Sequence, residues 1–145
     1  MRYFLLSMFM ASADLISKEI VKKKIPVGNK KQISGKLYVW HIKNKGMAYN
    51  KLENDRKKVL AASALASGAV GTYLFYLIRK GSGAFEKIGS AMILGGGLGN
   101  LADRIKNKEV TDFIYLDFKK APIFNFADIS ALIGGLIIVT KSMFD

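Results

Sequence analysis

The stretch ILGGGLGNLADRIKNKEVTDF, residues 93–113, decides the fold, because it joins a glycine-rich apolar run to a polar turn and an extended segment. The apolar run covers residues 87–105, about the length that crosses the hydrocarbon core of a bilayer. Gly95 and Gly99 have the four-residue spacing that lets membrane helices approach closely. The run is not a nucleotide-binding loop, because no Lys-Ser or Lys-Thr follows it and no strand precedes it. The stretch therefore predicts a closely packed membrane helix.

Three further apolar runs flank this stretch, and they cover residues 3–21, 59–78 and 123–140. The run 59–78 contains no charged residue, and twenty such residues span a bilayer core. Asp128 is the only charge in the last run. Asp14 and Lys18 lie four residues apart in the first run, so they share one helix face. The predicted fold class is an all-α integral membrane protein with four transmembrane helices, forming a single domain over residues 1–145.

Two segments outside these runs have the composition of strands. Residues 36–42 are rich in β-branched and aromatic side chains, and residues 110–118 also have an extended pattern. The first segment lies in the polar stretch 22–58, between the first two predicted helices. We therefore expect a small β-rich region there, lying on the membrane surface. Trp40 and Tyr49 within it suit the head-group belt of a bilayer.

The amino-acid composition limits the partners and the kinds of catalytic or metal site that the chain can have. Half of the 145 residues are hydrophobic, and 23 Lys and Arg outnumber 11 Asp and Glu, which gives a formal charge of +12. The excess predicts an anionic partner, and we favour lipid head groups over nucleic acid because the basic residues lie between apolar runs. There is no cysteine, so disulfides, thiolate catalysis and cysteine-based zinc sites are excluded. His41 is the single histidine, which excludes a two-histidine metal motif.

The N-terminus allows one alternative to a first membrane helix. Residues 1–13 end in Ala11-Ser12-Ala13, which resembles a signal-peptidase cleavage site. The charged segment before the apolar core is only Arg2, and three hydrophobic runs follow. We therefore keep the segment as the first helix.

Carboxylates in or beside membrane helices are costly and so indicate function or pairing. Asp14 has Lys18 nearby and Asp103 is followed by Arg104, so we expect both acids to form structural ion pairs. Two other acids in or beside the predicted membrane helices have no cation next to them in the sequence. These are Asp112 and Asp128.

Asp112 and Asp128 should lie at the same membrane face, because they fall at facing ends of antiparallel helices although sixteen residues separate them. Two close carboxylates share a proton, since both cannot stay ionised at short range. One can then activate water while the other protonates a leaving amine, which is the chemistry of peptide hydrolysis. Two alternatives remain from spacing alone. The acids could be unrelated surface groups, or could bind magnesium or calcium.

Taken together, five blocks resemble the lipoprotein signal peptidase (signal peptidase II) family, in the family's order and over most of the chain. The blocks are Asp14–Lys18, Asn44–Tyr49, Gly96–Arg104, Val110–Phe113 and Phe124–Asp128. The last three, at this spacing, carry most of the resemblance. It implies a multi-pass protein of the bacterial cell membrane with both termini in the cytoplasm and an active site near the outer face.

The resemblance also implies an activity. The enzyme would be an aspartic endopeptidase that needs no cofactor or metal, with Asp112 and Asp128 as its catalytic dyad. Its substrate would be a prolipoprotein carrying a diacylglyceryl group on the cysteine just after the cut, and globomycin would inhibit it. A monomer would suffice. Matches to substrate- or inhibitor-binding positions are Asn44, Asn100, Arg104 and Asn125; matches to supporting positions are Asp14, Lys18, Gly46 and Asp103.

The chain departs from the family pattern at a few places. Leu15 stands where the family usually has Gln, and Tyr49 and Asn50 also differ from the usual residues. The lysine-rich first loop would lie outside, against the positive-inside tendency, and we let the motif order decide. Two rival functions remain: a membrane subunit whose acids relay protons or ions, and a catalytically silent binder of lipidated peptides.

Overall fold

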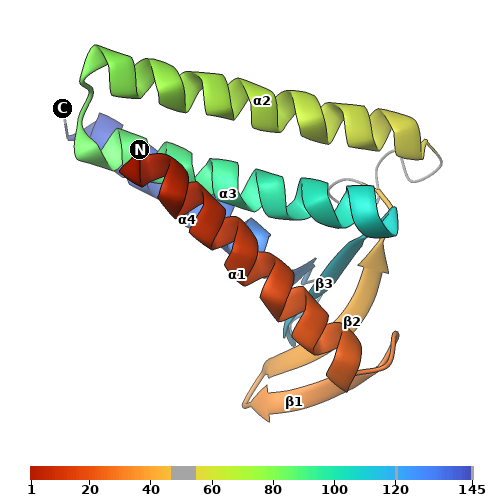
Figure 1. The fold of residues 1–145 in the computed structure, drawn as a ribbon. Helices are drawn as coiled ribbons and strands as arrows, with labels where there is room; N and C mark the ends of the chain where they lie inside the picture. The colour runs from red at the N-terminus through yellow and green to blue at the C-terminus, as the bar shows by residue number, and fades with distance from the viewer. Residues whose placement is uncertain (47–54, 120, 145) are drawn as a thin grey trace.

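The computed structural model describes residues 1–46, 55–119 and 121–144. Its helices are α1 (Arg2–Lys24), α2 (Arg56–Lys80), α3 (Ala84–Asn107) and α4 (Phe126–Met143). Helix α3 lies at the centre and packs against each of the other three, with α1 and α2 on different sides of it (Figure 1). The apolar runs expected from the sequence therefore form helices, and α1, α2 and α3 extend beyond both of their predicted ends.

Glycines allow the helices to approach α3. A Cβ on Gly95 would lie 2.7 Å from the Ser7 carbonyl oxygen of α1, and one on Gly99 would lie 2.5 Å from Asp14 Oδ2. A Cβ on Gly89 would likewise lie 2.6 Å from the carbonyl oxygen of Gly134 in α4. Real Cβ atoms do not come so close to other atoms, so these positions require glycine. The close packing predicted for Gly95 and Gly99 is confirmed.

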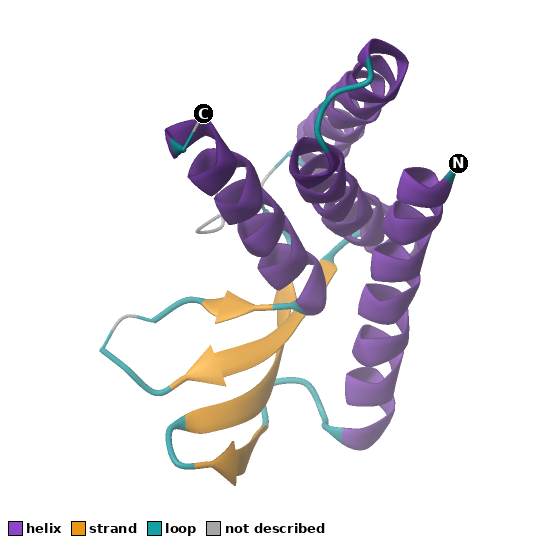
Figure 2. Ribbon diagram, turned by 90° about the vertical axis from the view of Figure 1, so that its left-hand side faces the viewer, coloured by secondary structure: helices purple, strands orange, loops and turns teal. Residues whose placement is uncertain are grey.

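The helices carry a small antiparallel sheet at one end (Figure 2). Its strands, in spatial order, are β1 (Lys30–Ser34), β2 (Leu37–Asn44), β3 (Val110–Leu116) and β4 (Ile123–Phe124). The two expected extended segments are confirmed as β2 and β3. The sheet is not confined to the stretch between the first two helices, because β3 and β4 come from the connection between α3 and α4. The fold is therefore helical with a β component.

Helix α4 begins later than predicted. Residues 123 and 124 pair with Tyr115 and Ile114 of β3 instead of starting the helix. Asn125 then caps α4, because its side chain accepts a hydrogen bond from the backbone N–H of Asp128. This early strand is what brings the first turn of α4 against the sheet.

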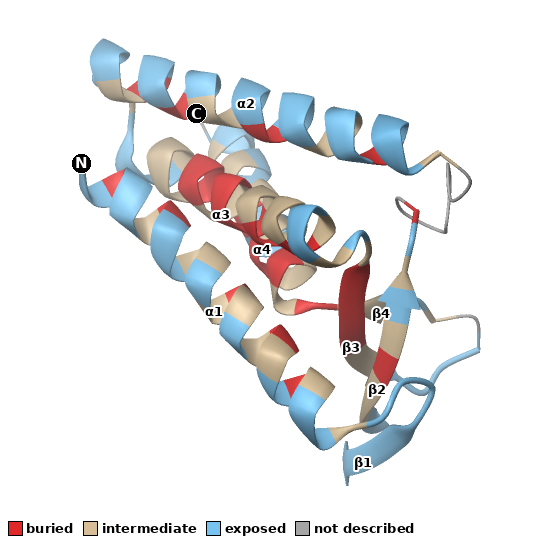
Figure 3. Cartoon of the chain, turned by 45° about the vertical axis from the view of Figure 1, so that its right-hand side comes forward, coloured by how far each residue is buried: buried red, intermediate tan, exposed pale blue. Residues whose placement is uncertain are grey.

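The outer faces of the helices are apolar and exposed (Figure 3). Leu65 in α2 is 75% exposed and Phe9 in α1 is 66% exposed. Within the described residues, α2 and α4 are long and apolar enough to cross a bilayer. Lipid contact would remove such surface from water.

Candidate active site

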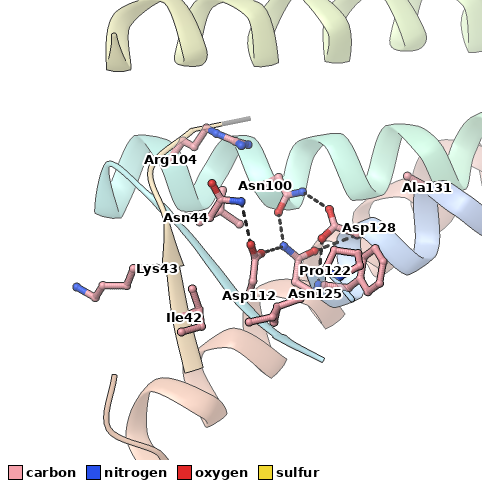
Figure 4. A pocket seen from close by; sticks show the side chains of 13 residues that line it. Ile42, Lys43, Asn44, Asn100, Arg104, Asp112, Pro122, Asn125, Asp128 and Ala131 are labelled. Atoms are coloured by element: carbon pink, nitrogen blue, oxygen red, sulfur yellow. Dashed lines mark hydrogen bonds between the residues drawn. The ribbon is translucent and has the colours of Figure 1, made fainter. Parts of the chain in front are cut away.

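A cavity of about 520 Å³ lies where the sheet meets the ends of α3 and α4 (Figure 4). Its polar lining comes from four elements: Asn44 at the end of β2, Asn100 and Arg104 on α3, Asp112 on β3, and Asp128 on α4. Asn125, the cap of α4, also lines it. The structure thus gathers in one cavity the two acids and four polar residues that the sequence singled out.

The two carboxylates are linked through one residue. Asn125 Nδ2 donates to Asp112 Oδ1 at 2.7 Å, and the Asn125 backbone N–H donates to Asp128 Oδ2 at 3.0 Å. Asp112 is only 5% exposed and Asp128 is half-buried. The two acids are therefore partners in one cavity and not unrelated surface groups.

Each carboxylate accepts a second N–H from an asparagine side chain. Asn44 Nδ2 donates to Asp112 Oδ2 at 3.0 Å, and Asn100 Nδ2 donates to Asp128 Oδ1 at 3.1 Å. Both oxygens of each acid thus have a donor, which fixes the side chains within the cavity. The arrangement orients two carboxylates from different elements toward the same space.

Buried charges behind the cavity fix Asn100. Lys18 Nζ donates to Asp14 Oδ2 at 2.6 Å and to Asn100 Oδ1 at 2.7 Å, and Lys18 and Asp14 are fully buried. Because Lys18 is a cation and donates only, the amide oxygen of Asn100 must face it, and the amide nitrogen is left to face Asp128. Asp14 Oδ1 accepts the Ala127 N–H at 2.9 Å, which ties α1 to the first turn of α4. The expected pair of Asp14 and Lys18 is confirmed.

Asp103 is also paired, but Arg104 is not its partner. Lys22 Nζ donates to Asp103 Oδ1 at 3.0 Å, and the Thr111 N–H donates to Oδ2 at 2.8 Å. Adjacent residues of a helix point in different directions, so a neighbour in sequence is a poor partner. Asp103 instead joins α3 to α1 and to the start of β3.

Arg104 points to the end of β2. Its Nη2 donates to the Gly46 carbonyl oxygen at 3.1 Å, while the Gly46 N–H donates to Asn44 Oδ1 at 3.1 Å. Gly46 therefore connects two of the lining side chains. Residues 47–50, which carry the rest of this block and the departures at Tyr49 and Asn50, lie outside the described residues.

Comparison with known proteins decides the family. Residues 6–144 match the family described as "Signal peptidase (SPase) II". The chain belongs to the signal peptidase II family. It is similar to the "Lipoprotein signal peptidase" of Enterococcus faecalis (strain ATCC 700802 / V583), with 30% identity over 99% of this chain and 88% of the relative.

Two solved structures resemble this signal peptidase II. One is described as "Bacterial membrane enzyme structure by the in meso method at 2.3 A resolution" and matches with a TM-score of 0.86 at 25% identity, covering 99% of this chain and 88% of that one. A second bacterial membrane enzyme, described at 1.9 Å, matches with a TM-score of 0.84 at 25% identity, covering 99% and 94%. The family resemblance seen in the motifs is confirmed, and the family with its bacterial membrane-enzyme neighbours supports a membrane peptidase.

The cavity of this signal peptidase II holds a carboxyl group with an altered pKa. Burial, and to a smaller extent the nearby Asp128 carboxylate, together raise the pKa of Asp112 to about 6. The hydrogen bonds from Asn44 and Asn125 lower the pKa and offset only part of that rise. Asp112 therefore keeps its proton to a higher pH than an ordinary aspartic acid, up to about pH 6.

The sequence patterns did not single out the rest of the cavity lining. Those residues are Ile42, Lys43, Val110, Pro122, Ile123, Phe124 and Ala131. Strand composition indicates where most of these residues lie, but not what they enclose. The cavity arises only when strands from two distant connections pair.

Proposed function

We propose that this signal peptidase II is an aspartic endopeptidase in which Asp112 and Asp128 form the catalytic pair. The observation that carries the proposal is their placement in one cavity, joined through Asn125 and each held by two N–H donors. Two such carboxylates supply a base and an acid without a metal or a covalent nucleophile.

We assign the two roles by environment. Asp128, in the first turn of α4, is the other carboxylate of the pair and takes a proton from the attacking water. Asp112, with its pKa near 6, donates a proton to the leaving amine as the tetrahedral intermediate collapses. The Arg104 guanidinium lines the same cavity and supplies donors for the substrate carbonyl.

The proposed substrate is a prolipoprotein, cut just before its diacylglyceryl-modified cysteine. The printed name of the Enterococcus faecalis relative supports the lipoprotein part. A second cavity of about 290 Å³ supports a lateral approach of lipid, because it shares Asn100, Arg104 and Asp128 with the first and continues along Val70 and Ile93. That cavity runs between α2 and the pair formed by α3 and α4.

The proposed topology has four transmembrane helices in the bacterial cell membrane, both termini in the cytoplasm and the cavity toward the outer face. The apolar exposed surfaces of the helices support it. Asn44, Asn100 and Arg104 would contact substrate or a globomycin-type inhibitor. Asn125 would act by positioning, because its amide hydrogens already serve Asn100 and Asp112.

Release of the signal peptide tests the proposal. Purified protein in detergent is incubated with a diacylglyceryl-modified prolipoprotein, and cleavage is followed by gel shift. Asp112→Asn, Asp128→Asn and added globomycin should each abolish cleavage. Asp117→Asn is the matched control, because Asp117 is an exposed acid just after β3, and it should cleave normally.

Two outcomes would overturn the proposal. Folded wild-type protein that cuts none of several modified substrates would indicate a silent lipopeptide binder or an ion-relay subunit. Cleavage that survives in both Asp→Asn variants would place the chemistry elsewhere. In either case the folded state is checked by the thermal unfolding midpoint.

A further inference from the structure

A further cavity, which we call the cationic cavity, lies beside the active site. Its volume is about 140 Å³, and it is formed where the end of β2, the start of α2 and the end of α3 meet. Five basic residues and two apolar residues line it, and they are Lys45, Arg56, Lys57, Val59, Leu60, Arg104 and Lys108. The lining therefore combines positively charged side chains with an apolar part, formed by Val59 and Leu60.

Most of this charge has no acidic partner among the residues that the structure describes. Among residues 1–46, 55–119 and 121–144, Lys45, Arg56, Lys57 and Lys108 form no ion pair. The two described acids adjacent to these cations in sequence are paired with other lysines: Asp55 with Lys58 at 3.0 Å and Glu109 with Lys43 at 2.6 Å. Like charges gathered around one cavity repel each other, and a bound anion relieves that repulsion.

We propose that this cationic cavity binds the phosphate of an anionic phospholipid. Arg56 and Lys57 open α2, so the proposed topology puts the cavity at the depth of the outer head groups. The positive end of α2 adds to the attraction for a phosphate. Only this placement in the membrane rests on the proposed function. Lipid binding itself can be measured without any cleavage.

The apolar part of the cationic cavity, formed by Val59 and Leu60, favours a lipid over free phosphate. Val59 is 2% exposed beneath the cations, and Leu60 beside it is 37% exposed. Farther along α2, Leu65 is 75% exposed. Acyl chains attached to a phosphate in the cavity would contact exposed apolar side chains of α2, which inorganic phosphate cannot use.

Arg104 connects this cavity with the active site, because its side chain lines both. Its Nε is buried and has no hydrogen-bond partner within the described part of the chain. A phosphate in the cationic cavity would thus face the Arg104 guanidinium from one side. Asp112 and Asp128 line the active-site cavity on the other side. Lipid occupancy would help to hold Arg104 in place.

The test is lipid-dependent stabilisation of the full chain in a neutral detergent. The thermal unfolding midpoint is followed while dioctanoyl phosphatidylglycerol, dioctanoyl phosphatidylcholine or inorganic phosphate is added. The cavity variant is Arg56→Gln/Lys57→Gln/Lys108→Gln. The control variant, Lys23→Gln/Lys24→Gln/Lys31→Gln, removes the same charge from exposed lysines outside the cavity.

We expect phosphatidylglycerol to raise the midpoint of the wild type and of the control variant. In the cavity variant, the lipid concentration for half of the effect should rise about tenfold or more, because three cations that attract an anionic lipid are removed. Phosphatidylcholine and phosphate should have little effect.

Three results would overturn the proposal. Equal loss in both triple variants would mean diffuse attraction to a cationic surface. An equal shift with phosphatidylcholine would mean general lipid stabilisation, and an equal shift with inorganic phosphate would mean a free-anion site. If the cavity variant does not fold, Arg56→Gln and Lys108→Gln are tested singly, and lipid responses like that of the wild type in both would also refute the site.

Discussion

Asn125 uses every polar atom of its side chain to organise the candidate active-site cavity. Its Oδ1 accepts the Asp128 N–H at 2.9 Å, and its Nδ2 donates to Asn100 Oδ1 and Asp112 Oδ1. The side chain is fully buried, so no water substitutes for these bonds. One residue thus combines two roles, a helix cap and a link between the two acids.

Two substitutions separate these roles. Asn125→Ser keeps a hydroxyl that can cap α4, while Asn125→Ala removes the cap, so the alanine variant should be less stable by about 1 kcal/mol. Both lose the donor to Asp112, and both should lose about a hundredfold in kcat through misplacement of the acid. Thermal unfolding and cleavage rates measure the two effects. A serine variant with normal kcat would contradict the positioning role.

The pKa of Asp112 gives a pH dependence with a definite sign. An acid that must donate its proton is active below its pKa, and the pKa of Asp112 is raised to about 6. We therefore expect kcat/KM to fall about tenfold per pH unit above about pH 6, because kcat/KM reports the free enzyme. Initial rates with a lipopeptide substrate between pH 5 and 9, roughly, test this. A flat profile to the alkaline end would contradict the role given to Asp112.

At the scale of helices and strands, α3 and α4 make reciprocal contacts through glycine. A Cβ on Gly89 would lie 2.6 Å from the Gly134 carbonyl oxygen, and a Cβ on Gly134 would lie 2.5 Å from the Gly89 carbonyl oxygen. This contact lies along the helix that carries Asp128, so it also sets the depth of the acid relative to α3.

Gly89→Ala should therefore force the two helices apart and destabilise the protein by about 1–3 kcal/mol. Gly135→Ala is the matched control, because nothing lies within 4 Å of its Cβ position and alanine is the better helix former. The control should be neutral or slightly more stable. Thermal unfolding in detergent compares them, and equal midpoints for the two variants would rule out the close contact.

The sequence predicts these elements better than their mutual contacts. Apolar runs located all four helices, and β-branched residues located β2 and β3. Strand β1 was missed because all of its residues are exposed, so it has no alternation to detect. The strand at residues 123–124 was read as helix, because a short apolar segment before an apolar helix has no periodicity of its own.

The same holds for the candidate site: the sequence predicts its residues better than their contacts. Conspicuous acids and asparagines in motif order indicated which residues matter, whereas their partners depend on the tertiary fold. Lys22 pairs with Asp103 across 81 positions of sequence, and no local pattern indicates that pairing. The hydrogen bond from Lys18 to Asn100, which spans 82 positions, is equally invisible in the sequence.

For the whole molecule, charge and motif order give opposite orientations. The lysine-rich sheet and the start of α2 lie at one end, and the positive-inside tendency would put that end in the cytoplasm. The proposed function puts the same end outside, where modified prolipoproteins would reach the cavity. Anionic lipid in the cationic cavity would offset part of the cost of that orientation, since lysines near an anionic leaflet are attracted to it.

The absence of cysteine makes a direct topology test possible. Ser34→Cys marks the exposed sheet and Ser142→Cys marks the exposed end of α4. On bacterial spheroplasts, a membrane-impermeant maleimide should label the first variant, and should label the second only after the membrane is opened, because four spans leave the α4 end inside. The cysteine-free wild type controls for background. The opposite labelling pattern would show that the lysines, and not the catalytic motifs, set the orientation, and the cavity would then face the cytoplasm.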